Sequence, residues 1–152
     1  LILCFIVGYM LCKYYKEKFL DVADLVAPVI ALAQSIGRWG NFFNEEAHGY
    51  ATDLPWAQII NGVGYHPTFL YESIWCFLLF IFLMWFSNNK RSFSGQIICL
   101  YGILYSVERF FVESFRTDSL MVGPLRQAQV ISIVIIIVCV ALYIFLKKKQ
   151  KK

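Results

Sequence analysis

Charged residues are scarce in this sequence: they make up 16% of its 152 residues, whereas 59% are hydrophobic and 18% are aromatic. A soluble domain contains about 25% charged residues, so this composition argues against a soluble globular protein. The apolar runs do not alternate with polar residues, as half-buried strands would, and they approach the roughly 20 residues that a membrane-spanning helix requires. We therefore predict an all-α fold, a polytopic membrane helical bundle in which residues 1–152 form a single integral membrane domain.

Motifs of several common enzyme and metal-site classes are also missing. The sequence contains no P-loop, no GxSxG motif and no dinucleotide-binding glycine pattern. Its cysteines lie in apolar segments and form no CxxC pair, which argues against a disulfide framework or a zinc site. They are Cys4, Cys12, Cys76, Cys99 and Cys139. The histidines and acids after residue 43 match no familiar metal-ligand spacing, so we expect neither a metal nor another cofactor.

Five apolar segments are predicted as helices, with an extracytoplasmic loop or arm over residues 44–64. They cover residues 1–12, 25–43, 69–86, 95–112 and 128–146. The first segment is short and is preceded by neither a methionine nor a basic signal-peptide region. We therefore expect a fragment of a longer protein, with further spans upstream of residue 1.

Lysines follow the first, third and fifth segments only. With five crossings these clusters share one face, which the positive-inside rule predicts to be cytoplasmic. There they would contact anionic membrane lipids, and their division among short loops argues against nucleic-acid binding. The opposite face has arginines instead, together with acids and amides. Because a guanidinium group binds phosphate or carboxylate through two hydrogen bonds, we predict an anion-binding site on the extracytoplasmic side.

The first group of candidate residues lies at the end of the second segment. On a continuous helix, Arg38, Asn41 and Glu45 would share a face. We interpret Arg38 as a phosphate ligand, with Asn41 and Glu46 orienting either Arg38 or the substrate. The alternative is an interfacial arginine that extends to the lipid headgroups, flanked by glycines that serve helix packing.

The second group lies in the fourth segment, where Tyr105, Arg109 and Glu113 recur at intervals of four residues and Arg116 follows. Ionisable groups within a membrane helix face the bundle interior or a water-filled cavity. The stripe is interpreted either as the wall of a headgroup pocket, with Arg109 as a second phosphate ligand, or as a ladder of ion pairs that fixes helix register. Glu108 has no evident role beyond pairing with a neighbouring arginine.

The third group surrounds Pro67, a residue suited to the start of a helix. Glu72 is expected in the first helical turn, where the helix dipole favours an acid. His66 is interpreted either as a proton carrier, since imidazole titrates near neutral pH, or as a solvated loop residue.

These groups resemble, in order, three sequence blocks of the bacterial prolipoprotein diacylglyceryl transferase family. The blocks are residues 38–49 (RWGNFFNEEAHG), residues 66–72 (HPTFLYE) and residues 105–116, followed by Thr117 and Asp118. The resemblance covers nearly the whole chain. It implies a transferase of the bacterial plasma (inner) membrane that moves the diacylglyceryl group of phosphatidylglycerol to the lipobox cysteine thiol of a prolipoprotein signal peptide. A thioether forms and glycerol phosphate leaves.

The resemblance also implies roles for individual residues. It implies catalytic roles for Arg38, Arg109, Tyr105 and Glu113. It implies substrate binding by Arg38, Asn41, Glu46, Gly49, His66, Glu72 and Arg116. A His-Gly-Gly stretch with a candidate base is expected upstream and is absent here, so we expect the 152-residue chain alone to be inactive.

Two alternatives are a transporter or channel-like bundle with a buried anion site, and a lipid phosphatase or phosphotransferase. A transport pathway requires polar groups at the midplane and on both faces, whereas the non-lysine polar residues here cluster towards one side. The second alternative requires a nucleophilic histidine or metal-binding carboxylates, and the corresponding motifs are missing.

Overall fold

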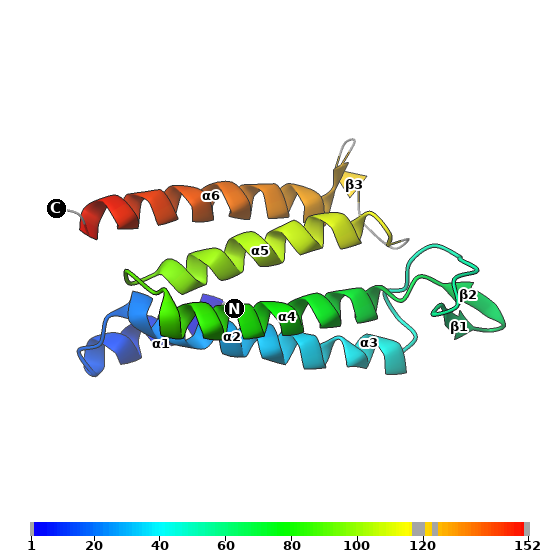
Figure 1. The fold of residues 1–152 in the computed structure, drawn as a ribbon, viewed down its shortest axis with the longest axis horizontal. Coiled ribbons are helices and arrows are strands. Elements are labelled where there is room, and N and C mark those ends of the chain that lie inside the picture. Colours follow the sequence, from blue (N-terminus) through cyan, green and yellow to red (C-terminus); the bar gives the residue numbers. More distant parts are fainter. Residues whose placement is uncertain (1, 117–120, 123–124, 151–152) are drawn as a thin grey trace.

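The chain forms a bundle of α-helices in the computed structural model, which describes residues 2–116, 121–122 and 125–150 (Figure 1). Within these residues the helices are α1 (Ile2–Tyr14), α2 (Phe19–Gly37), α3 (Trp39–Phe43), α4 (Thr68–Asn89), α5 (Gln96–Glu113) and α6 (Gln127–Gln150). Two short antiparallel strand pairs lie between them in sequence: β1 (Gln58–Ile60) with β2 (Val63–Tyr65), and β3 (Met121–Val122) with β4 (Leu125–Arg126). The predicted all-α class is confirmed. Four of the five predicted apolar segments each fall on one helix, and the second, residues 25–43, is divided between α2 and α3.

Three helical stretches in the described part of the chain are long and apolar enough to cross a membrane: Phe19–Phe43, Thr68–Asn89 and Gln127–Gln150. The remaining two predicted segments differ from these for separate reasons. Helix α1 has 13 residues. Helix α5 is long enough but includes Glu108, Arg109 and Glu113, and it lies between α4 and α6 (Figure 1). Its charges are therefore placed inside the bundle, where other protein groups can compensate them.

The centre of the bundle is closely packed where α2, α4 and α5 meet. Ala27 and Ala31 of α2, Leu79 and Leu83 of α4, and Ile97 of α5 form a buried apolar cluster. The alanines allow the neighbouring helix backbones to approach closely. This packing sets the relative positions of the three helices, and with them the positions of the polar groups near their ends.

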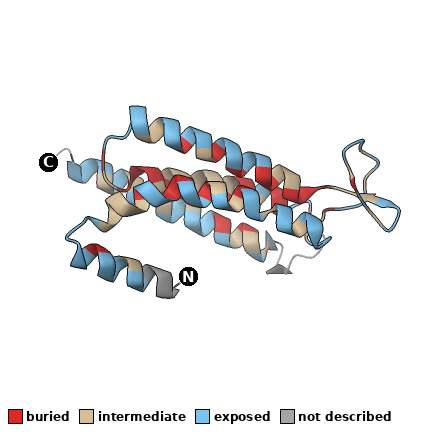
Figure 2. Ribbon diagram, turned by 90° about the horizontal axis from the view of Figure 1, so that it is seen from below, coloured by how far each residue is buried: buried red, intermediate tan, exposed pale blue. Residues whose placement is uncertain are grey.

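The outward faces of the helices are largely exposed (Figure 2), and many of the residues exposed on them are large and hydrophobic. Helix α6 is the clearest case, because its buried residues are the polar Gln129 and Ser132 whereas Ile137 is 62% exposed. A monomeric soluble protein rarely exposes a continuous apolar surface of this extent. The distribution is that of a protein whose outer surface contacts lipid.

The two ends of the bundle differ in charge. The α1–α2 connection, the α4–α5 connection and the C-terminal end of α6 lie at one end, on the left in Figure 1. These segments hold the lysine clusters, so the prediction that the clusters share one face is confirmed. The opposite end holds the C-terminus of α5, the N-termini of α4 and α6, and the β1–β2 hairpin, which extends beyond the helices (Figure 1).

Candidate functional site

A buried carboxylate joins two arginines at the end of the bundle opposite the lysines. Glu72 of α4 has a side chain only 2% exposed; its Oε2 atom lies 3.0 Å from Nε of Arg38, and its Oε1 atom accepts a hydrogen bond from Nη1 of Arg109. Arg109 also donates from Nη2 to Oε2 of Glu113 at 2.7 Å. An isolated charge in a low-dielectric interior costs several kcal/mol, so each of these groups depends on the others.

The local structure explains how these four side chains meet. Arg38 stands at the junction between α2 and α3, and its backbone closes the last turn of α2 through a 3.0 Å bond from its N–H to the Gln34 carbonyl. Arg109 and Glu113 are one turn apart on α5. Tyr105, one turn earlier, accepts a 3.3 Å hydrogen bond from Nη2 of Arg38. The predicted stripe on α5 therefore does face a common cluster, which we call the arginine cluster: Arg38, Glu72, Tyr105, Arg109 and Glu113.

The structural explanation predicted for Glu72 is wrong. The first turn of α4 contains no acidic residue, since the helix begins at Thr68. Glu72 instead lies on the buried stripe of α4 that includes Thr68, Cys76, Leu79 and Leu83. This stripe could have predicted the pairing from the sequence. An acid at a buried helical position requires a buried cation, and arginine is the residue type suited to supply one.

The predicted helix face shared by Arg38, Asn41 and Glu45 does not form. Helix α3 ends at Phe43, and Glu45 has φ of 54°, which takes the chain out of the helix. Asn41 is half-buried and Glu46 is exposed, and neither side chain makes a hydrogen bond or ion pair with another described residue. Glu72 and Tyr105 orient Arg38 instead. A contact of Asn41 or Glu46 with substrate stays a prediction.

Gly49 serves a junction between the outer loop and α5. Its N–H donates to the His66 carbonyl at 2.9 Å, and its backbone pairs with that of Arg116. A Cβ atom at this position would lie 2.6 Å from Cβ of His66 and 2.9 Å from the Phe115 carbonyl oxygen. Only glycine allows this close approach of three segments, so the structure assigns Gly49 a steric role.

His66 lies in the same junction and outside the arginine cluster. Its Nδ1 atom is 3.3 Å from the Tyr71 hydroxyl, and its ring packs against Phe115 with centroids 5.5 Å apart. Nearby, the Thr68 hydroxyl donates to the Ala47 carbonyl. These contacts attach the outer loop to the start of α4. Thr117 and Asp118, at the end of the third block, lie outside the described residues.

Arg126 lies at the same end of the bundle as the arginine cluster, and its contacts are with backbone carbonyls and a tyrosine. Its Nη1 group donates to the backbone carbonyls of Glu113 and Arg116, the latter at 2.6 Å, and its Nη2 group donates to the Tyr50 hydroxyl at 2.8 Å. Arg126 therefore satisfies carbonyl groups at the end of α5 and connects them to α6 and the outer loop.

Glu108 differs from the other acids of α5. It is 4% exposed, and among the described residues neither of its carboxyl oxygens has a hydrogen-bond partner. The predicted pairing with a neighbouring arginine is therefore wrong, although Glu108 is within electrostatic range of Glu72, Arg109 and Arg38. A buried carboxyl group without a partner is energetically unfavourable. Glu108 is therefore a buried carboxyl group beside the arginine cluster whose hydrogen-bonding capacity is not used by any described residue.

The fold and this site define a polytopic helical membrane protein with an arginine–carboxylate centre at one end of its bundle. A sequence model of the prolipoprotein diacylglyceryl transferase family matches residues 1–145. The chain belongs to that family.

Individual relatives are similar over most of the chain. The proteins from Clostridioides difficile (strain 630) and Finegoldia magna are each 54% identical, over 95% and 93% of this chain, and a protein from Thermosynechococcus vestitus is 48% identical over 86% of it. All three are named phosphatidylglycerol–prolipoprotein diacylglyceryl transferase. The matches cover 58%, 57% and 53% of these relatives, respectively, so this chain spans little more than half of their length.

Proposed function

We propose that this protein transfers the diacylglyceryl group of phosphatidylglycerol to the lipobox cysteine of a prolipoprotein signal peptide. The substrate sulfur forms a bond to the terminal glyceride carbon, and the bond from that carbon to the phosphate oxygen breaks. Glycerol phosphate leaves with the electron pair, and the thiol proton passes to a base. The observation that carries the proposal is the convergence of Arg38 and Arg109 on one carboxylate, which holds two phosphate-binding groups side by side.

The arginine cluster suits the charge that develops in this reaction. Negative charge grows on the phosphate oxygen as the carbon–oxygen bond breaks, and oriented N–H donors stabilise such charge. Arg38 uses its Nε group and one Nη2 hydrogen within the described protein, and Arg109 uses one hydrogen on each Nη. N–H groups of both arginines therefore remain for a ligand. Their side chains are 21% and 17% exposed, so a headgroup can reach them.

The position of the cluster fits the delivery of both substrates. The lysine-bearing end is assigned to the cytoplasm by the positive-inside rule, which puts the arginine cluster at the extracytoplasmic end of a bundle in the bacterial plasma membrane. A phospholipid reaches this depth from the surrounding bilayer. A signal peptide that has crossed the membrane presents its cysteine at the same face. The family match favours this reaction over the transporter alternative.

The test compares arginine-to-lysine variants in the protein at its full natural length. Arg38→Lys and Arg109→Lys keep the charge but lose the planar fork, and we expect each to lower turnover of labelled phosphatidylglycerol with a lipobox peptide about 100-fold. Arg91→Lys is the matched control, because Arg91 also binds two carboxylates but lies at the other end of the bundle. Near-normal turnover in both test variants would refute the proposed role of the cluster.

A further inference from the structure

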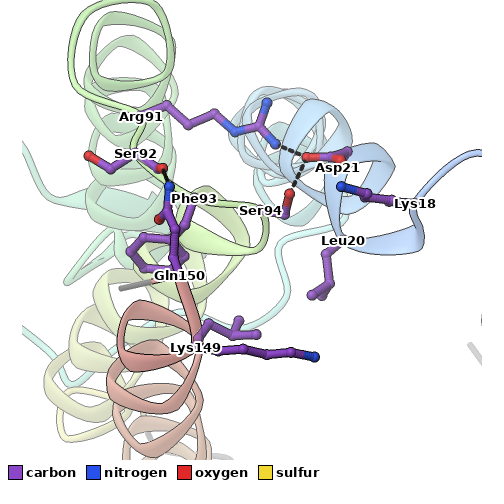
Figure 3. A pocket seen from close by; sticks show the side chains of 10 residues that line it. Lys18, Leu20, Asp21, Arg91, Ser92, Phe93, Ser94, Lys149 and Gln150 are labelled. Carbon is purple, nitrogen blue, oxygen red and sulfur yellow. Dashed lines mark hydrogen bonds and ion pairs between the residues drawn. The ribbon is translucent and has the colours of Figure 1, made fainter. Parts of the chain in front are cut away.

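A second polar site occupies the opposite end of the bundle. A cavity of about 640 Å³ opens there between the start of α2, the α4–α5 connection and the end of α6 (Figure 3). Its lining includes three basic side chains, Lys18, Arg91 and Lys149, and one acidic side chain, Asp21. The cavity therefore has an excess of positive charge, and it is separated from the arginine cluster by the length of the helices.

One wall of the cavity is held in place by hydrogen bonds. The Nη2 group of Arg91 binds Asp21, and the Ser94 hydroxyl donates to Oδ1 of Asp21 at 2.7 Å (Figure 3). Nε of Arg91 lies 3.1 Å from Oδ2 of Asp24. Asp24 is 1% exposed and also accepts the N–H of Gly95 at 2.8 Å. The charge of Arg91 is thus already balanced by Asp21 and Asp24. The Oδ1 atom of Asp21 is already bound by Arg91 and Ser94.

The two lysines are not compensated in this way. Lys18, just before α2, and Lys149, near the end of α6, are exposed, and the hydrogen bonds and ion pairs of the described residues include neither ammonium group. Figure 3 shows both side chains bordering the cavity, with Leu20 beside them. Lys18 is within electrostatic range of Asp21, but neither ammonium group is held in a hydrogen bond or ion pair by a described residue, so both can contact an anion in the cavity.

The cavity also has an apolar part. A Cβ atom built on Gly95 would lie 2.8 Å from Cδ1 of Leu146 and 3.4 Å from both Cδ atoms of Leu20, so leucines from α6 and α2 meet over the glycine backbone. Phe93 lines the same cavity. A ligand that fits this combination has an anionic head and an apolar body attached to it.

We propose that this cavity binds the phosphate group of an anionic phospholipid. Lys18 and Lys149 contact the phosphate, and the first carbons of the acyl chains lie on Leu20 and Leu146. Basic pockets between helix ends at the cytoplasmic face of a membrane bind lipid headgroups in this way. The lipid connects α2 and α6, whose leucines both lie over Gly95 in the α4–α5 connection. This site is independent of the proposed transfer, because no residue of the arginine cluster takes part.

The test measures lipid binding to the full-length protein in detergent by native mass spectrometry. Phosphatidic acid is the anionic probe, and phosphatidylcholine of the same acyl chains is the zwitterionic comparison. We expect the double variant Lys18→Gln/Lys149→Gln to bind phosphatidic acid about 10- to 30-fold more weakly than the unaltered protein, from the attraction typical of two surface lysines. The double variant Lys13→Gln/Lys90→Gln is the control, since it removes the same charge at the same end but outside the cavity. The arginine cluster is intact in both variants.

Three outcomes would overturn the proposal. Equal losses in the two double variants would mean that general surface charge, rather than this cavity, attracts the lipid. Equal binding of phosphatidylcholine and phosphatidic acid would mean that the phosphate contacts are not selective. Displacement of phosphatidic acid by an equal concentration of inorganic phosphate would identify a small-anion site in which the acyl chains have no part.

Discussion

Replacement of Glu72 by glutamine tests whether the arginine cluster is held together by charge. The substitution keeps the size of the side chain but removes the counter-ion shared by Arg38 and Arg109. Arg109 retains Glu113, whereas among the described residues Arg38 retains the neutral Tyr105 hydroxyl alone. Removing one partner of a buried ion pair typically costs about 3–5 kcal/mol. Because the two arginine side chains are 21% and 17% exposed, solvent offsets part of this cost, and we expect a loss near about 3 kcal/mol.

The assay is thermal unfolding in detergent, followed by the fluorescence of the four tryptophans. For a protein of this size, about 3 kcal/mol corresponds to a Tm lower by roughly 6–12 °C. Glu46→Gln is the matched control: Glu46 is exposed and has no polar partner among the described residues, so its Tm is expected to stay within about 2 °C of the original.

A second substitution identifies the cause of the loss. If the penalty arises from an uncompensated guanidinium, Arg38→Gln in the Glu72→Gln background should recover part of the lost stability, because the unpaired charge is removed. A Tm for Glu72→Gln equal to that of Glu46→Gln would refute the reasoning, and so would a double variant that is less stable by the sum of the two single losses.

Three further predictions use the same unfolding assay. Glu108→Leu should leave the Tm unchanged or raise it, because the carboxyl group is buried without a partner among the described residues; a fall of several degrees would reveal a hidden partner. Gly49→Ala should cost about 1–3 kcal/mol, since its new methyl group would overlap His66 and Phe115, whereas Gly40→Ala, which has open space, should cost nothing. Asp24→Asn should lower the Tm and speed amide hydrogen exchange at Gly95 and Ile98, whose N–H groups its carboxylate accepts at 2.8 and 2.9 Å; unchanged exchange would contradict this.

The parts of the site that were predictable from sequence are those set by local geometry. Tyr105, Arg109 and Glu113 recur at the helical interval, so their common face follows from the chain being helical there. The pairing of Glu72 with both arginines does not follow in this way. It depends on how α2, α4 and α5 pack, and residues 38, 72 and 109 are far apart in the chain. A local explanation of Glu72 by the helix dipole was available and was wrong.

Helix boundaries also depend on contacts between distant parts of the chain. The second apolar segment was predicted to begin at Leu25, which follows Asp21 and Asp24 in the sequence. Helix α2 begins at Phe19 instead. The two acids are tolerated because Arg91 and the backbone at the start of α5 supply their partners. Those partners lie about 70 residues further along the chain. No pattern within the segment itself indicates them.

The arginine cluster is close to electrical neutrality, and this has a consequence for the proposed transfer. Arg38 and Arg109 are balanced by Glu72 and Glu113, so the cluster holds two guanidinium groups at membrane depth without the cost of two uncompensated charges. Glu72 binds each of them on one side and thereby fixes the orientation of both. The N–H groups on their other sides are then directed before the lipid arrives, and little reorganisation is required as charge develops on the leaving phosphate. Glu72 occupies one side of each arginine, and by doing so it makes the proposed phosphate site on their other sides rigid.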